Sequence, residues 1–124
     1  MSISEQIADK LRALEAKVPG VEASLVATPD GLPIASALPP EVDEEHIAAM
    51  CATVHSSAER VCSELGKGSP EVSFVRGEGG YILVCRAGPS AILMVMASKE
   101  AKLGLLFLEM GRLAKEIEEL VSAL

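Results

Sequence analysis

The residues best suited to chemistry lie on one predicted helix, which begins after Asp43 and runs to about Leu65. Cys51 and His55 are one turn apart there, a spacing at which a thiolate and an imidazole can bind a metal ion. Cys62 lies about 16 Å further along the axis, too far to share that ion. No third group or oxyanion hole is evident for a Cys–His nucleophile. We therefore expect no metal, no cofactor and no catalytic residue, with these thiols buried beside a sheet.

Two other motifs are better explained by structure than by chemistry. The stretch "GKGS" at Gly66–Ser69 lacks the spacing of a phosphate-binding loop and ends a helix instead of opening one. Acidic residues between Glu41 and Glu45 precede His46, as is typical of a solvated helix start with Asp43 as N-cap. We expect this chain to bind no nucleotide.

Composition limits the classes of function. The 124 residues suggest one domain over 1–124, and with 49% apolar but only 2% aromatic residues its core must be aliphatic. The net charge of −7, with no basic run, argues against nucleic acid and anionic membranes as partners. The longest apolar stretches, "AILMVMA" and "LGLLFLEMG", are too short to insert into a membrane. Three cysteines without CxxC spacing and the lack of a signal-peptide core indicate a reduced, cytoplasmic protein.

Periodicity and turn signals predict the order helix, two strands, helix, three strands, helix. Asp-Gly and Gly-rich turns should join neighbouring strands into hairpins, and Pro33 makes its strand an edge strand. The strands from Tyr81 and Ser90 are apolar on both alternating faces, so both faces of the sheet must be covered. We predict an α+β fold with a five-stranded antiparallel sheet, two helices on one face and one on the other. The elements begin near Ile3 (helix), Val21 and Leu32 (strands), Asp43 (helix), Glu71, Tyr81 and Ser90 (strands) and Lys99 (helix).

The last helix has a main apolar stripe, and two of its leucines lie off that stripe. We expect the first helix to cover Leu105 and Leu108, with Gly104 and Gly111 permitting close packing. The alternative is an exposed patch for a partner.

The second helix is unusual because both of its sides are poor in charge, with Arg60 the single charged residue on them. One side should cover the sheet with an apolar stripe, and the other carries small or hydroxylic residues that let two helices approach closely. A charge-poor second side favours a second copy packed across a two-fold axis, whereas an Ala-rich helix with an unremarkable surface is the simpler alternative. The sheet-facing stripe is Ile47, Met50, Cys51, Val54, Ala58, Val61, Cys62 and Leu65; the opposite side is Ala49, Ala52, Thr53, Ser56 and Arg60.

This layout resembles the Roadblock family of dynein light-chain type. The resemblance rests on "GVEASLVATPDGLPIAS" after the first helix, "GYILVCRAGPSAILMVMAS" before the last, and "LGLLFLEMGRLAKEIEEL" within it. It implies a dimer in which the second helices pack together and the third strands, here "EVSFVR", pair into one ten-stranded sheet. The implied dimer interface is Ala49, Ala52, Thr53, Ser56, Arg60, Val72 and Phe74.

The resemblance also implies a function. Members of this family are partners of small Ras-like GTPases, and the bacterial ones activate a polarity GTPase without supplying an arginine finger. Others serve as scaffolds. Our hypothesis is a non-catalytic, homodimeric regulator of a small Ras-like GTPase; the alternatives are a structural adaptor and, more distantly, a ligand-sensing domain. The candidate GTPase-facing residues are Thr53, Ser56, Glu59 and Arg60, and we expect Arg60 to be paired or at the interface rim because Glu59 and Glu64 flank it.

Overall fold

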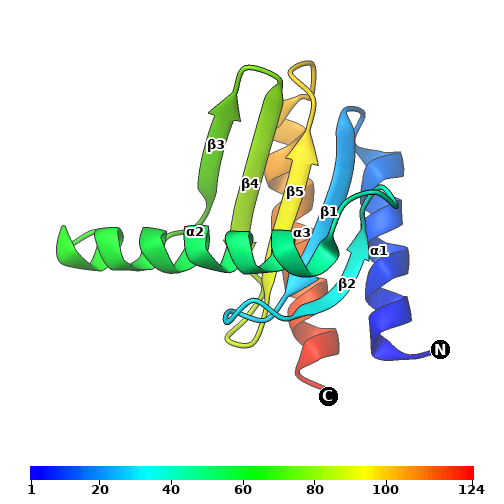
Figure 1. Cartoon of the computed structure of the whole chain (residues 1–124), viewed down its shortest axis with the longest axis horizontal. Helices are drawn as coiled ribbons and strands as arrows, with labels where there is room; N and C mark the ends of the chain where they lie inside the picture. The colour runs from blue at the N-terminus through cyan, green and yellow to red at the C-terminus, as the bar shows by residue number, and fades with distance from the viewer.

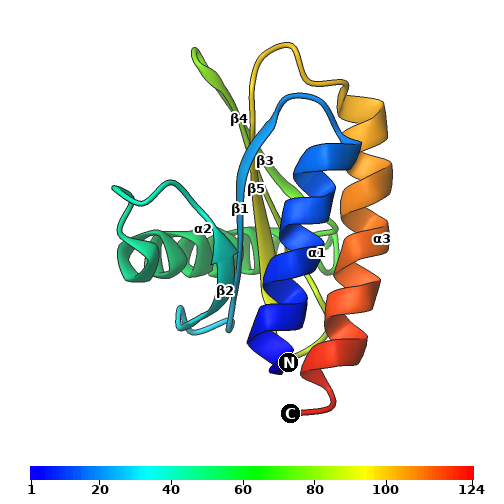
Figure 2. The ribbon, with the colours of Figure 1, turned by 90° about the vertical axis from the view of Figure 1, so that its right-hand side faces the viewer.

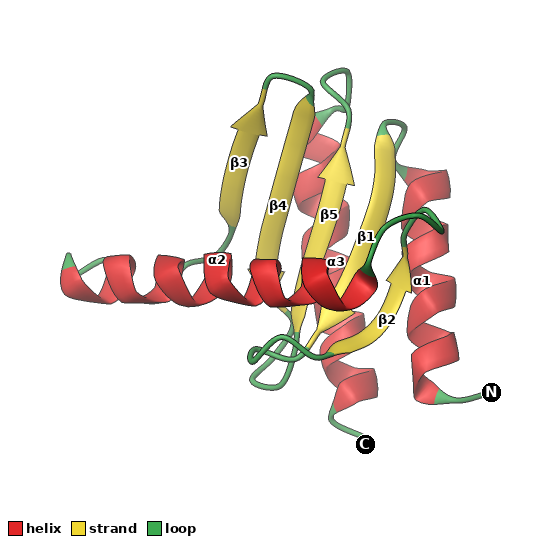
Figure 3. Ribbon diagram, in the orientation of Figure 1, coloured by secondary structure: helices red, strands yellow, loops and turns green.

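The computed structural model describes all 124 residues and contains three helices and five strands (Figure 3). The predicted element order is confirmed, with boundaries that shift by a few residues. In chain order the elements are α1 (Ile3–Lys17), β1 (Val21–Ala27), β2 (Pro33–Ala37), α2 (Glu44–Glu64), β3 (Ser73–Gly77), β4 (Gly80–Arg86), β5 (Ile92–Ala97) and α3 (Leu103–Val121).

The five strands form one antiparallel sheet in the order β2-β1-β5-β4-β3. The three predicted hairpins are present, and β2, which begins with Pro33, is an edge strand as expected. The other edge is β3, which pairs with β4 alone. In the β1–β2 turn, Gly31 has a φ of +96°, and a Cβ there would meet the Cα of Ala49 at 3.1 Å. This turn therefore needs glycine both for its backbone and for its approach to α2.

Three layers result, as Figure 2 shows: α1 and α3 lie side by side on one face of the sheet and α2 lies on the other. We call these the two-helix face and the α2 face. The predicted division of two helices and one is confirmed. None of the three helices combines the length and the apolar character that crossing a membrane would require.

Strand alternation divides the core between the two faces. In β5, Leu93 and Val95 point toward α1 and α3, while Ile92 and Met94 point toward α2. The cluster on the two-helix face has 21 buried residues and the cluster on the α2 face only 8. A single helix thus buries far less of its sheet face than two helices do.

The two helices α1 and α3 agree with the sequence predictions except at the start of α3. The N-cap of α1 is Ser2, whose hydroxyl accepts from the Glu5 amide at 3.1 Å. The last helix begins at Leu103 and not near Lys99, because residues 98–102 form a turn. The apolar stripe predicted for α3 is confirmed: its four central residues are buried and the two at its ends are partly buried. The stripe is Leu103, Leu106, Met110, Leu113, Ile117 and Leu120.

The expectation for the off-stripe residues of α3 is wrong in part. Leu105 packs against the core, but Leu108 is 52% exposed. A Cβ on Gly104 or Gly111 would meet nothing within 4 Å, so neither glycine contacts α1. The two glycines lie on the solvent side of α3.

Ser24 gives the first testable prediction. It is fully buried on β1, and its hydroxyl has no hydrogen-bond partner. Because an unsatisfied buried polar group costs about 1–3 kcal/mol, we expect Ser24→Ala to raise the free energy of unfolding by about 1 kcal/mol, measured by urea denaturation. The control is Ser36→Ala, since the Ser36 hydroxyl donates to Glu44 at 3.1 Å. That variant should lose stability, and a destabilised Ser24→Ala would contradict the assignment of Ser24 as an unsatisfied group.

Candidate protein–protein interface on the second helix

The orientation of α2 is set at its N-terminus. The Asp43 carboxylate accepts from the His46 amide at 3.3 Å, and Glu44 and Glu45 occupy the first turn, where the helix dipole favours negative charge. Asp43 is thus confirmed as the N-cap. From there α2 crosses the α2 face and contacts all five strands (Figure 1).

The sheet-facing side of α2 overlaps the predicted stripe only in part, at Cys51 and the partly buried Ile47. The buried residues are Ala48, Cys51, Ala52 and His55, spaced by three and four residues. Ala52 is only 7% exposed and packs in the core of its own chain, so it has little surface for contact with a second copy. Small side chains face the sheet because they let the helix approach it closely. The predicted stripe is therefore rotated away from the side that the sheet actually contacts.

The larger apolar residues of α2 are consequently exposed. Met50 is 46% exposed, Val54 38% and Val61 52%. Met50 and Val54 lie over the sheet beside an open groove. Val61 cannot be buried by its own sheet because α2 is longer than the sheet is wide. Its 21 residues span about 31 Å, whereas five strands at about 4.8 Å spacing span about 19 Å. Figure 1 shows the C-terminal part of α2 extending beyond β3.

An apolar groove runs beside α2 on the same face. It has a volume of about 400 Å³ and is lined by apolar side chains and one thiol. Its floor includes Val75, Ile82 and Met96, which are cross-strand neighbours on β3, β4 and β5. Met50 and Val54 form its wall on α2. We call this the α2 groove. Apolar surface of this kind, continuous with an exposed helix side, is typical of an interface.

The groove ends at a free sheet edge. β3 has a hydrogen-bonding partner on one side only, and Val75 on this strand is 48% exposed. Unpaired amide and carbonyl groups along such a strand can pair with a strand of another chain. The predicted interface residues Val72 and Phe74 belong to this edge, but they face the two-helix side, away from α2.

The polar candidates lie together on the outer side of α2. Thr53 donates its hydroxyl hydrogen to the Ala49 carbonyl oxygen at 3.1 Å, and Ser56 donates to the Thr53 carbonyl oxygen at 3.2 Å. Arg60 is exposed and makes no ion pair, contrary to the first alternative expected for it. Glu59 instead pairs with Arg86 at 3.0 Å.

Cysteine and histidine chemistry finds little support in the geometry. No group of three or more His, Cys, Asp or Glu side chains could hold a metal ion. Burial raises the pKa of the Cys51 thiol and raises the pKa of Cys85 to about 12. Thiols held in the protonated form are poor nucleophiles and poor ligands.

His55 has a structural role beneath the helix. It is 2% exposed, and its Nε2 lies 3.5 Å from a Glu59 carboxylate oxygen. Burial lowers the pKa of His55; Glu59 acts to raise it and Arg86 to lower it further. Burial therefore favours the neutral imidazole in the folded chain. The sequence marks this residue only as a possible ligand, because nothing in the pattern identifies the side of α2 that faces the sheet.

The pH dependence of stability tests that role. Because the pKa of His55 is lower in the folded chain than its unfolded value near 6.5, the unfolded chain binds the proton first as the pH falls. We expect the free energy of unfolding to decrease as the pH falls below about 6.5. The His55→Gln variant should show a weaker decrease between about pH 8 and about pH 5 in urea titrations, while His46→Gln retains it. Equal slopes for His55→Gln and the unmodified chain would rule out His55 as the cause.

Comparisons with known proteins agree with this architecture. Relatives from Methanocaldococcus jannaschii include the uncharacterized protein MJ1340, which is 39% identical over 102 residues, covering 82% of this chain and 89% of that protein. The uncharacterized protein MJ0714 is 37% identical over 114 residues, covering 92% and 96%.

Solved structures share the fold. A Roadblock/LC7 domain from Streptomyces avermitilis superimposes with a TM-score of 0.87 at 24% identity, covering 93% of this chain and 97% of that one. The gliding protein MglB from Thermus thermophilus has a TM-score of 0.88 at 17% identity, covering 100% and 94%. The model of the Roadblock/LC7 domain family matches residues 7–97, most of the chain. This protein belongs to the Roadblock/LC7 family.

Proposed function

We propose that this chain is a homodimeric, non-catalytic regulator of a small Ras-like GTPase. The observation that carries the proposal is the apolar side of α2, which its own sheet leaves exposed beside an open apolar groove. Membership of the Roadblock/LC7 family supports it, since the family resemblance implies GTPase partners. The proposal has two parts: the chain forms a dimer, and the dimer presents a surface that binds the GTPase.

A second copy of the chain fits the α2 groove. An antiparallel α2 from that copy would cover Met50, Val54 and Val75, and the overhanging Val61 would in turn reach the partner's sheet. Pairing of the two β3 edges would satisfy their free amide and carbonyl groups and produce one ten-stranded sheet. The interface that we propose differs from the one implied by the sequence. It leaves out the buried Ala52 and includes the exposed apolar residues Met50, Val54 and Val61 of α2.

The outer sides of the two α2 helices would form the GTPase-facing surface. Thr53, Ser56 and Arg60 point away from the sheet and are exposed. Glu59 contributes less, because it is committed to Arg86 and lies beside His55. A flat helical platform suits binding to the switch regions of a GTPase better than entry into its nucleotide site.

The position of Arg60 supports activation without an arginine finger. A catalytic arginine supplied to a GTPase must reach the γ-phosphate. Arg60 is within a regular helix, one turn before its C-terminal end at Glu64, and not on a protruding loop. We propose that any stimulation of GTP hydrolysis arises from reorienting the GTPase's own switch residues.

The dimer can be tested by introducing one charged residue in the C-terminal part of α2, which extends beyond β3. Val61→Glu should place two carboxylates in the apolar contact and shift the mass in light scattering toward one chain. The matched control is Leu108→Glu on α3, because Leu108 and Val61 are both 52% exposed. An unchanged dimer for Val61→Glu, or equal dissociation of the control, would contradict the interface.

The GTPase step is tested with small Ras-like GTPases encoded in the same genome. We expect the dimer to bind one of them only in the form loaded with a GTP analogue, and to stimulate hydrolysis. Arg60→Ala should weaken binding several-fold and leave turnover in the saturated complex nearly unchanged. A loss of more than a hundredfold with dimer and complex intact would identify Arg60 as a finger. Binding that is indifferent to the nucleotide would favour the structural adaptor.

A further inference from the structure

The two-helix face carries a feature that the α2 interface does not use. All three aromatic residues of the chain meet there: the ring of Phe74 stacks on Tyr81 at 5.4 Å and lies 6.0 Å from Phe107. Phe74 is 41% and Phe107 40% exposed. Half-exposed aromatic side chains that stack on one another are typical of a binding surface, because covering them removes apolar area from water.

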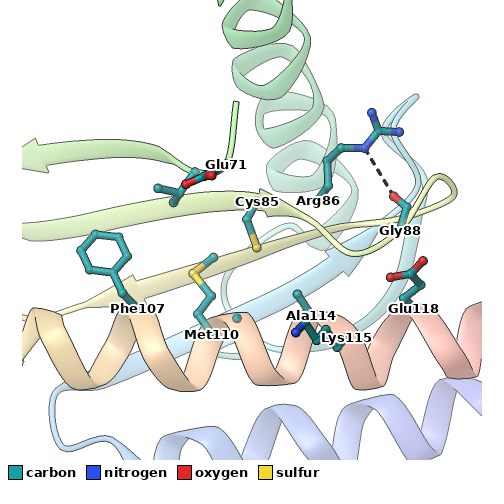
Figure 4. Close-up of a pocket in the computed structure, with 11 residues that line it drawn as sticks. Glu71, Cys85, Arg86, Gly88, Phe107, Met110, Ala114, Lys115 and Glu118 are labelled. Carbon is teal, nitrogen blue, oxygen red and sulfur yellow. Dashed lines mark hydrogen bonds between the residues drawn. The ribbon is translucent and has the colours of Figure 1, made fainter. Parts of the chain in front are cut away.

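A groove of about 420 Å³ continues from this cluster between α3 and the β3 edge (Figure 4). Its floor is apolar, with the buried side chains of Cys85, Met110 and Ala114. Figure 4 shows Phe107 at one end of the groove, and Arg86 with Gly88 near Glu118 at the other. We call this the α3 groove.

The shape of the α3 groove fits a helix. One side of α3 lines it from Phe107 to Glu118, about 16 Å along the axis and three turns in length. α1 already packs along the other side of α3 in the same layer (Figure 2). The groove is the corresponding position on the β3 side, which no element of this chain occupies. Gly111 lies on its wall, and a Cβ there would meet nothing within 4 Å, so a helix axis can approach closely.

The charges around the groove favour a basic occupant. Glu71 and Glu118 line it and neither is in an ion pair, whereas Lys115 is the single unpaired cation. The remaining cation, Arg86, is bound to Glu59 and to the Gly88 carbonyl oxygen. The chain as a whole carries a net charge of −7, which attracts a positively charged segment to this surface.

We propose that the α3 groove is a docking site for a basic amphipathic helix of another protein. The apolar stripe of that helix packs on the half-exposed rings of Phe74 and Phe107 above the apolar floor of the groove, and its lysines or arginines pair with Glu71 and Glu118. The site is on the opposite face of the sheet from the α2 groove.

The test uses a synthetic probe, a helical peptide of about 18 residues, or about five turns, with leucines on one side and lysines on the other. The chain has one tyrosine and no tryptophan, so the fluorescence of Tyr81 in the cluster reports binding directly. We expect saturable binding that weakens with salt and a change in Tyr81 emission. A peptide of the same composition with its leucines scattered should bind at least tenfold more weakly.

Two glycine variants decide the location. Gly111→Leu fills the groove and should weaken binding at least tenfold, while Gly104→Leu, outside the groove on the same helix, should leave it unchanged. Neither variant should destabilise the fold, because both replace an exposed helical glycine by a better helix former. Equal binding by both variants, or by the scattered peptide, would overturn the proposal. So would a change in the mass of the free protein with Gly111→Leu, which would show a second copy in the groove.

Discussion

The structure depends on a sheet that is apolar on both faces. Two helices cover one face, whereas the single helix α2 covers only part of the other. On the two-helix face, α1 and α3 bury 21 core residues; on the other, α2 helps to bury 8. Because apolar burial is the main favourable term in folding and association, covering the exposed apolar part of the α2 face would stabilise the molecule. Three features of the molecule remain without a partner: the part of α2 that extends beyond the sheet, the apolar groove beside α2, and the edge strand β3.

These features share one solution in the proposed dimer. A second α2 fills the groove, a second β3 pairs with the free edge, and the overhang of each helix finds the sheet of the other. The buried side of α2 fits this arrangement because alanine, cysteine and neutral histidine keep the helix close to the sheet. The outer polar side is then left for a different partner. In the proposed dimer, the surface for self-association and the surface for a GTPase would lie on different sides of α2.

Much of this architecture could be predicted from the sequence. Turn signals such as "PDG" and the proline in β2 indicated the hairpins and an edge strand, and the apolar character of both faces of β4 and β5 indicated that helices cover both sides of the sheet. The side of α2 that faces the sheet could not be predicted, because Met50 and Val54 satisfy the same periodicity as Ala48 and Cys51. Choosing between them requires the width of the sheet and the closeness of packing. The position of Phe74 beside Phe107 likewise depends on which strand ends at the sheet edge.

The central claim is that the α2 face is completed by a second copy of the chain. Light scattering on the unmodified protein over a dilution series tests it most directly. We predict twice the 13.0 kDa mass of one chain, down to micromolar concentration. A mass of a single chain throughout the series would contradict it, since the apolar side of α2 and the β3 edge would then remain in water.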